Sequence, residues 1–140
     1  MKSLILISVA LISSSVFACT DFSGSYKDQE GNVSTITQVG CESIKFLSGG
    51  DTSSYDMLVD GKEHLLLKLV IGSSTLTVNA KANFENSILK INTIGISETD
   101  GNTDTSYAEL ITSLDDNGDL VNSQTNDDGT TDVTVLNRIK

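Results

Sequence analysis

Short runs in which apolar and polar residues alternate follow one another along most of the chain. In the clearest run, residues 75–84, every second residue is apolar and the residues between them are Thr, Asn or Lys. This period of two is typical of a β-strand with one buried face. Comparable runs recur about every ten residues, separated by pairs such as Asp60-Gly61 and Asn117-Gly118, which favour tight hairpins. The pattern therefore predicts a series of antiparallel strands.

The composition supports an all-β fold. The 140 residues include no Pro, no Trp and 11 Gly, and we find no convincing amphipathic helix. About eight to ten short strands are expected. An open meander would expose the edges of its outermost strands, and closure removes them. The sequence thus predicts an antiparallel meander closed into an up-and-down barrel, in which the first and last strands pair.

Two runs depart from simple alternation. Residues 63–71 are apolar on both faces, which predicts a strand covered twice, either by a terminus or by a second subunit, and a homodimer through Leu66 and Val70 is one interpretation. Around Gly95 the parity changes, which predicts a β-bulge or a bend. In residues 63–71, one face of the predicted strand carries Leu65, Leu67, Leu69 and Ile71.

The first 18 residues have the parts of a secretory signal peptide. Lys2 is followed by an apolar stretch, residues 4–12, and by a small-residue cleavage site at Ala18. The apolar stretch is shorter than the roughly 20 residues that span a bilayer. We therefore expect a removable segment, residues 1–18, and a single exported β-barrel domain, residues 19–140, in the periplasm or outside the cell.

Cys19 and Cys41 are the two cysteines of the chain. In an exported protein a pair of cysteines is normally oxidised, and a Cys19–Cys41 bridge would contribute roughly 3 kcal/mol by restricting the unfolded chain. The alternative uses Cys19 differently, because residues 16–19 resemble a bacterial lipoprotein box. The protein would then be anchored to a membrane through a lipid at Cys19. We favour the disulfide.

Charge and candidate chemistry exclude several function classes. The formal net charge of −10 repels nucleic acid and anionic membranes. His64 is the single histidine and has no recognisable nucleophile motif near it, so we expect a protein without enzymatic activity or cofactor. A weak calcium candidate has oxygen donors at Asp115, Asn117 and Asp119, but Leu120 stands where an EF-hand loop requires Gly. A hairpin turn explains the same residues.

Both ends of the chain carry residues that resemble those of a known superfamily. Gly24-Ser25-Tyr26 opens the first strand and Arg138 lies on the last. This arrangement is similar to that of the lipocalin-like, or calycin, β-barrels, which have Gly-x-Trp on the first strand and a cation on the last. The resemblance implies that Arg138 lies across the Tyr26 ring where the barrel closes. It also implies a small, often apolar ligand in the barrel, or an inhibitor or adhesin role of the outer surface.

The interpretation we favour is a non-enzymatic barrel that binds a small, apolar molecule in its interior. The alternative is a filled barrel whose outer surface binds another envelope protein or a second copy of the chain. Room inside the barrel distinguishes the two. The residues expected to line the interior are Tyr55, Met57, Leu76, Val78, Ala80, Ala82, Phe84, Ala108 and Leu110.

Overall fold

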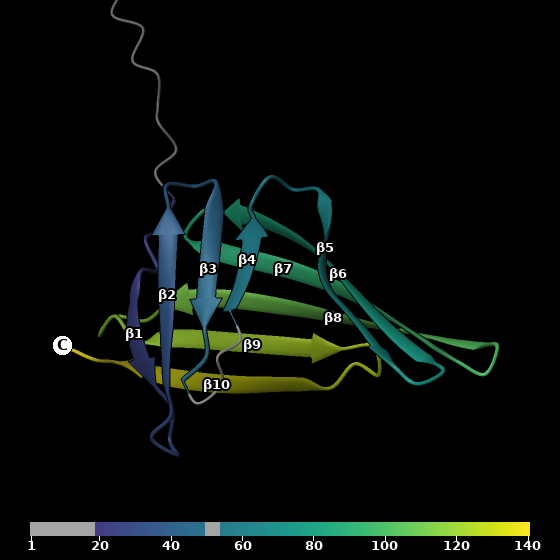
Figure 1. The fold of residues 1–140 in the computed structure, drawn as a ribbon. Coiled ribbons are helices and arrows are strands. Elements are labelled where there is room, and N and C mark those ends of the chain that lie inside the picture. The colour runs from purple at the N-terminus through teal and green to yellow at the C-terminus, as the bar shows by residue number, and fades with distance from the viewer. Residues whose placement is uncertain (1–18, 50–53) are drawn as a thin grey trace, which may run out of the picture.

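The computed structural model describes residues 19–49 and 54–140, and all regular elements in these ranges are strands (Figure 1). The expected signal peptide, residues 1–18, lies outside the described residues. In the described ranges, no helix is long and apolar enough to cross a membrane. The strands are β1 (Gly24–Lys27), β2 (Val33–Val39), β3 (Ser43–Leu47), β4 (Ser54–Leu58), β5 (Glu63–Ile71), β6 (Ser74–Glu85), β7 (Ile88–Thr99), β8 (Asn102–Leu114), β9 (Leu120–Asn126) and β10 (Thr131–Arg138).

The predicted antiparallel meander is confirmed. The strand order across the sheet is β4-β3-β2-β1-β10-β9-β8-β7-β6-β5, so consecutive strands are neighbours and the two ends of the chain meet between β1 and β10. Tyr26 is directly opposite Arg138 in that pair. The sheet curls into a nearly closed barrel in which β1–β4 run across the direction of β7–β10 (Figure 1).

The barrel differs from the predicted closed barrel because closure is incomplete between β4 and β5. These two strands are consecutive and in contact, yet they are the two ends of the strand order. The backbone of their connection bonds elsewhere: Val59 N donates to Glu42 O at 2.8 Å, and Gly61 N donates to Ala82 O at 2.9 Å. The chain therefore enters β5 beside β6, and a seam stays open along β4. We call this opening the β4–β5 seam.

Alternating side chains from both groups of strands meet inside the barrel. Inward residues on neighbouring strands are paired in register, such as Ile44 with Met57 and Ala82 with Ile91. Full burial of an aliphatic side chain stabilises the fold by about 1.5–3 kcal/mol. The buried side chains therefore determine which face of each strand points inward. The buried apolar residues are Phe22, Tyr26, Ile36, Ile44, Met57, Ala80, Ala82, Leu89, Ile91 and Leu120.

A bulge lies in β5, whereas at Gly95, where the sequence predicted a bulge or a bend, the pairing register does not shift. The pairing of β5 with β6 shifts between Leu65 and Leu67, so Leu66 packs against the core whereas Val70 is 63% exposed. The two residues proposed for a shared dimer face therefore lie on different surfaces. Strand β7 pairs without a shift through Gly95.

Gly95 instead leaves room for a side chain of the neighbouring strand β8. A Cβ atom at this position would lie 2.8 Å from Ser106 Oγ on β8, which is closer than real Cβ contacts allow. The β5–β6 and β7–β8 hairpins continue past the rest of the barrel (Figure 1). We call this extension, residues 68–78 and 94–107, the distal arm. Its exposed apolar side chains include Leu69, Val70, Ile71, Leu76 and Tyr107.

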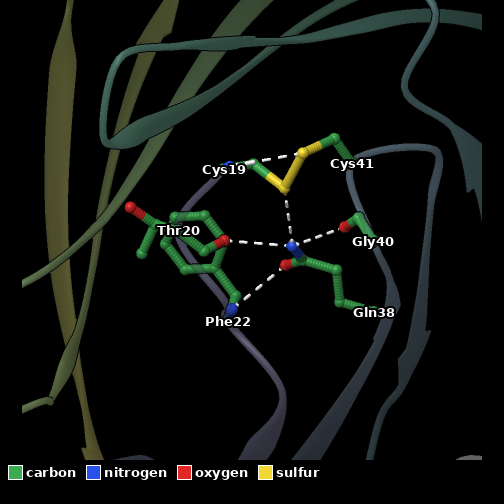
Figure 2. The surroundings of a disulfide bond; sticks show 6 residues. All are labelled: Cys19, Thr20, Phe22, Gln38, Gly40 and Cys41. Carbon is green, nitrogen blue, oxygen red and sulfur yellow. Dashed lines mark hydrogen bonds between the residues drawn. A yellow bond between two sulfur atoms is a disulfide. The ribbon is translucent and has the colours of Figure 1, made fainter. Parts of the chain in front are cut away.

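A disulfide holds the N-terminal segment against the turn after β2 (Figure 2). The Cys19–Cys41 bridge is confirmed, with the two Cα atoms 5.6 Å apart. In this state the Cys19 sulfur is part of the bridge, so the lipid-anchored alternative does not apply to it. Such bridges are typical of proteins in an oxidising compartment.

Gln38 completes this junction. Its Nε2 donates to Thr20 O at 3.0 Å and Gly40 O at 2.8 Å, and its Oε1 accepts from Phe22 N at 3.0 Å (Figure 2). One side chain thus forms hydrogen bonds with backbone groups on both sides of the bridge. The segment before β1 is not part of the sheet, so these backbone groups have no strand partner there. The disulfide and Gln38 together fix the position of Phe22.

Removing the bridge should lower the stability of the barrel. We expect the double variant Cys19→Ser, Cys41→Ser to lose roughly 3 kcal/mol of unfolding free energy, because the unfolded chain regains the freedom of the closed loop. Urea unfolding followed by circular dichroism measures this. Reducing agent should shift the wild-type midpoint in the same way and leave the variant unchanged; a variant as stable as the oxidised wild type would contradict the prediction.

Candidate functional site

The N-terminal segment closes one end of the barrel. Phe22 is fully buried, and its ring stacks on Phe84 with the centroids 6.1 Å apart and the planes at 6°. The Tyr26 hydroxyl donates to Phe22 O at 2.9 Å. Because the disulfide and Gln38 hold the same segment from outside, Phe22 acts as a plug at this end of the interior.

Tyr26 and Arg138 form the contact that the sequence suggested. The guanidinium carbon of Arg138 lies 5.8 Å from the centroid of the Tyr26 ring, within the range of a cation–π interaction. Arg138 Nη2 also donates to Ser23 O at 2.6 Å, and Arg138 N donates to an Asp119 carboxylate oxygen at 2.7 Å. A Cβ atom at Gly24 would lie 3.2 Å from Arg138 Nε, so the absence of a side chain there makes room for the guanidinium.

Two hollows lie in the interior beyond Tyr26. The inner hollow has a volume of about 210 Å³ and the seam hollow, at the β4–β5 seam, about 260 Å³. Both are lined by Phe46, Tyr55 and Leu110. Phe46 and Tyr55 are directly opposite each other on β3 and β4, so this pair forms the partition between the hollows. Each volume is below the roughly 300 Å³ of the smallest common ligand pockets, and the two together exceed it.

The residues expected to line the interior divide into two groups. Tyr55, Met57, Ala108 and Leu110 line the seam hollow. The β6 residues line neither hollow, because β6 passes from the core into the distal arm: Ala80 and Ala82 are buried in the core, and Leu76 is 38% exposed. The other two β6 residues, Val78 and Phe84, are partly buried.

Several lining residues were not among those expected. The inner hollow is also lined by Tyr26, Ser34, Thr35, Ile36, Phe46, Leu47, Ser48, Thr112, Leu120, Asn122 and Leu136, and the seam hollow by Phe46, Leu66, Ile91, Thr93 and Gln124. The inward parity of β3 and β8 could have identified Phe46 and Thr112. Asn122 has the same parity as the inward Leu120, but the apolar Val121 next to it favours the opposite face, so the sequence alone does not assign Asn122 to the interior.

The inner hollow carries a polar pair on one wall. Thr112 is 1% exposed, and its hydroxyl donates to Asn122 Oδ1 at 2.8 Å. The residues face each other on β8 and β9. In the seam hollow, the Thr93 hydroxyl donates to Ala108 O at 3.3 Å. Among the described residues that line the two hollows, none carries a formal charge at neutral pH.

The remaining candidate residues lie on the surface and serve local structure. His64 Nε2 lies 2.9 Å from an Asp60 carboxylate oxygen, and this hydrogen bond holds the pKa of Asp60 below its ordinary value. Asp115 accepts backbone hydrogen bonds from Asn117 and Asp119 at 2.9 Å each, as in a hairpin turn. Within the described ranges, no three His, Cys, Asp or Glu side chains are grouped so that they could hold a metal ion.

Comparison of the chain with protein-family models, with curated proteins and with solved structures finds no match.

Alkaline titration should reveal the burial of Tyr26. Burial raises the pKa of Tyr26 above its ordinary value of 10.0, and Arg138 opposes part of that shift. In the unfolded chain this phenol loses its proton near pH 10, while the folded protein keeps it at higher pH. Its contribution to stability is thus complete below about pH 10 and is lost as the pH rises toward the folded pKa. We expect the unfolding free energy to fall more steeply above about pH 10 in the wild type than in Tyr26→Phe.

The same variant has a second expected effect at neutral pH. Tyr26→Phe leaves Phe22 O without its hydroxyl donor, which should cost about 1–3 kcal/mol of unfolding free energy. Urea unfolding at pH 7 and at several alkaline values gives both quantities. Parallel alkaline curves for the two proteins would show that Tyr26 ionises as easily in the folded chain as in the unfolded one.

Proposed function

We propose that this protein is an exported, lipocalin-like barrel that binds a small, mainly apolar molecule in the inner and seam hollows. One observation carries the proposal: two adjoining hollows in the barrel share the Phe46–Tyr55 partition. Packed protein interiors leave few voids larger than a water molecule. The Tyr26–Arg138 contact supports membership of the lipocalin-like superfamily, and the disulfide supports residence in the periplasm or outside the cell.

The shape of the barrel favours entry through the β4–β5 seam. The opposite end is closed by Phe22, which is fully buried. At the seam, the strands are not hydrogen-bonded to each other, and Tyr55 on β4 is 38% exposed. A molecule that enters here meets the seam hollow first and the partition next. Movement of the exposed Tyr55 ring would join the hollows, without breaking a strand ladder.

A bulky side chain on the shared wall should abolish binding. Leu110 lines both hollows, so in Leu110→Trp the larger ring occupies the space that the ligand needs. We expect the affinity for the apolar fluorophore N-phenylnaphthylamine to fall by on the order of tenfold or more. Fluorescence titration measures it. The matched control is Val133→Trp, because Val133 is 64% exposed on the outer face of β10.

Two further results decide the outcome of this test. Leu110→Phe, a smaller change, should weaken binding less than Leu110→Trp if space is the cause. Native mass spectrometry of protein isolated from its own source should show added mass that disappears on denaturation. Equal fluorophore affinity in the wild type, the Leu110 variants and the control would place binding outside the barrel and reject the proposal.

A second candidate function is self-association through the edge of β5. In the distal arm, Leu69, Val70 and Ile71 are 44%, 63% and 69% exposed, and the described chain provides no strand on the outer side of this edge. An antiparallel pair of two β5 strands, centred on Leu69, would set Lys68 against Val70 of the second copy. This register avoids like charges and extends the apolar row, so a second copy of the chain fits the edge.

A charge on this edge should keep the protein monomeric. Val70→Lys places a second cation beside Lys68 and opposes strand pairing, so we expect the dimer dissociation constant to rise by at least about tenfold. Sedimentation velocity over a range of concentrations measures this. Val121→Lys is the control, because Val121 lies on β9, which is paired on both sides. A wild type that remains monomeric at the highest concentration would exclude this function.

A further inference from the structure

The polar pair of the inner hollow is arranged to present a hydrogen-bond donor. Asn122 Oδ1 accepts from the buried Thr112 hydroxyl at 2.8 Å, which fixes the orientation of the Asn122 amide. Its other end, Nδ2, has no hydrogen-bond partner among the described residues, and no described side-chain nitrogen or oxygen is both buried and unpaired. The Nδ2 group therefore keeps accessible surface, and Asn122 lines the inner hollow.

The other walls of the inner hollow are apolar or hydroxyl-bearing. Leu120 and Leu136 are directly opposite each other beside this pair, and Tyr26, whose hydroxyl already donates to Phe22 O, forms the closed end. None of the described residues that line either hollow is a cation, so no side chain there could pair with a carboxylate or phosphate of a ligand. A charged group placed here would lose its hydration without gaining a partner of opposite charge.

We propose that the ligand is a neutral, mainly apolar molecule with a carbonyl or similar hydrogen-bond acceptor, which Asn122 Nδ2 binds in the inner hollow. This inference rests on the proposed interior binding and adds the chemical class of the ligand and the residue that selects it. Thr112 is a positioning residue, because it acts through Asn122. The apolar part of the ligand then passes the Phe46–Tyr55 partition into the seam hollow.

Three probes with chains of equal carbon number test the proposal: methyl nonyl ketone, undecane and undecanoate. Their affinities are measured by displacement of N-phenylnaphthylamine at pH 7.5 or so. In the wild type, undecanoate should bind more weakly than the ketone. In Asn122→Leu, the ratio of ketone affinity to undecane affinity should fall by about threefold to tenfold, the effect of one neutral hydrogen bond. Retained undecane binding in this variant shows that the barrel is folded.

Substitutions of Thr112 distinguish two roles of this residue, the orientation of the Asn122 amide and the packing of the core. Thr112→Val keeps the volume but removes the hydroxyl, so the Asn122 amide can rotate and the ketone-to-undecane ratio should fall by about two- to threefold. Thr112→Ser keeps the hydroxyl and should keep the ratio. A purely structural role of Thr112 would change both affinities together and leave the ratio constant.

The outcomes are distinguishable. A ratio that does not change in Asn122→Leu, or undecanoate that binds as tightly as the ketone, overturns the assigned ligand class while interior binding stands. Failure of all three probes to displace the fluorophore from the wild type overturns the proposed function as well. A selective loss of ketone affinity in Asn122→Leu and Thr112→Val supports both.

Discussion

The pairing of the first strand with the last is the constraint on which the barrel depends. Strands β1–β4 and β5–β10 would otherwise be two separate antiparallel sheets, each with exposed edges. β1 is only four residues long, and its ladder with β10 contains two paired positions. Side chains therefore reinforce it. Tyr26 fills the interior at the junction, and Arg138 covers its ring and bonds to Ser23 O.

Closure at this junction determines where the interior stays open. Phe22 lies just before β1 and is held by the Tyr26 hydroxyl, by Gln38 and by the disulfide, so the closed end and the junction share one set of contacts. The barrel then has its break on the far side, between β4 and β5. In the proposed function the ligand enters at the seam, so the contacts that hold the closed end stay intact.

The sequence predicts the strands well because their physical signal is local. Alternation and Gly-containing turns gave the number and direction of the strands, and the two cysteines gave the bridge. The bulge at Leu65–Leu67 could not be read in the same way: three consecutive leucines satisfy either parity, so the alternation alone does not show that Leu66 packs against the core. Only four of the nine residues predicted to line the interior line a hollow, because the alternation of β6 is the same in the core, at Ala82, as in the distal arm, at Leu76.

Asn122 shows why an interior site is hard to predict from its residues alone. Two apolar side chains at positions 112 and 122 could form the same wall of the inner hollow, and they would need no hydrogen bond. The polar pair instead costs desolvation, which the bond of 2.8 Å between Thr112 and Asn122 offsets only in part. A fully packed barrel gains nothing from such a pair, since each member could be replaced by a hydrophobic residue of similar shape. In the proposed function, an acceptor on the ligand bonds to the remaining amide hydrogens of Asn122, and this bond would offset the desolvation cost of the polar wall.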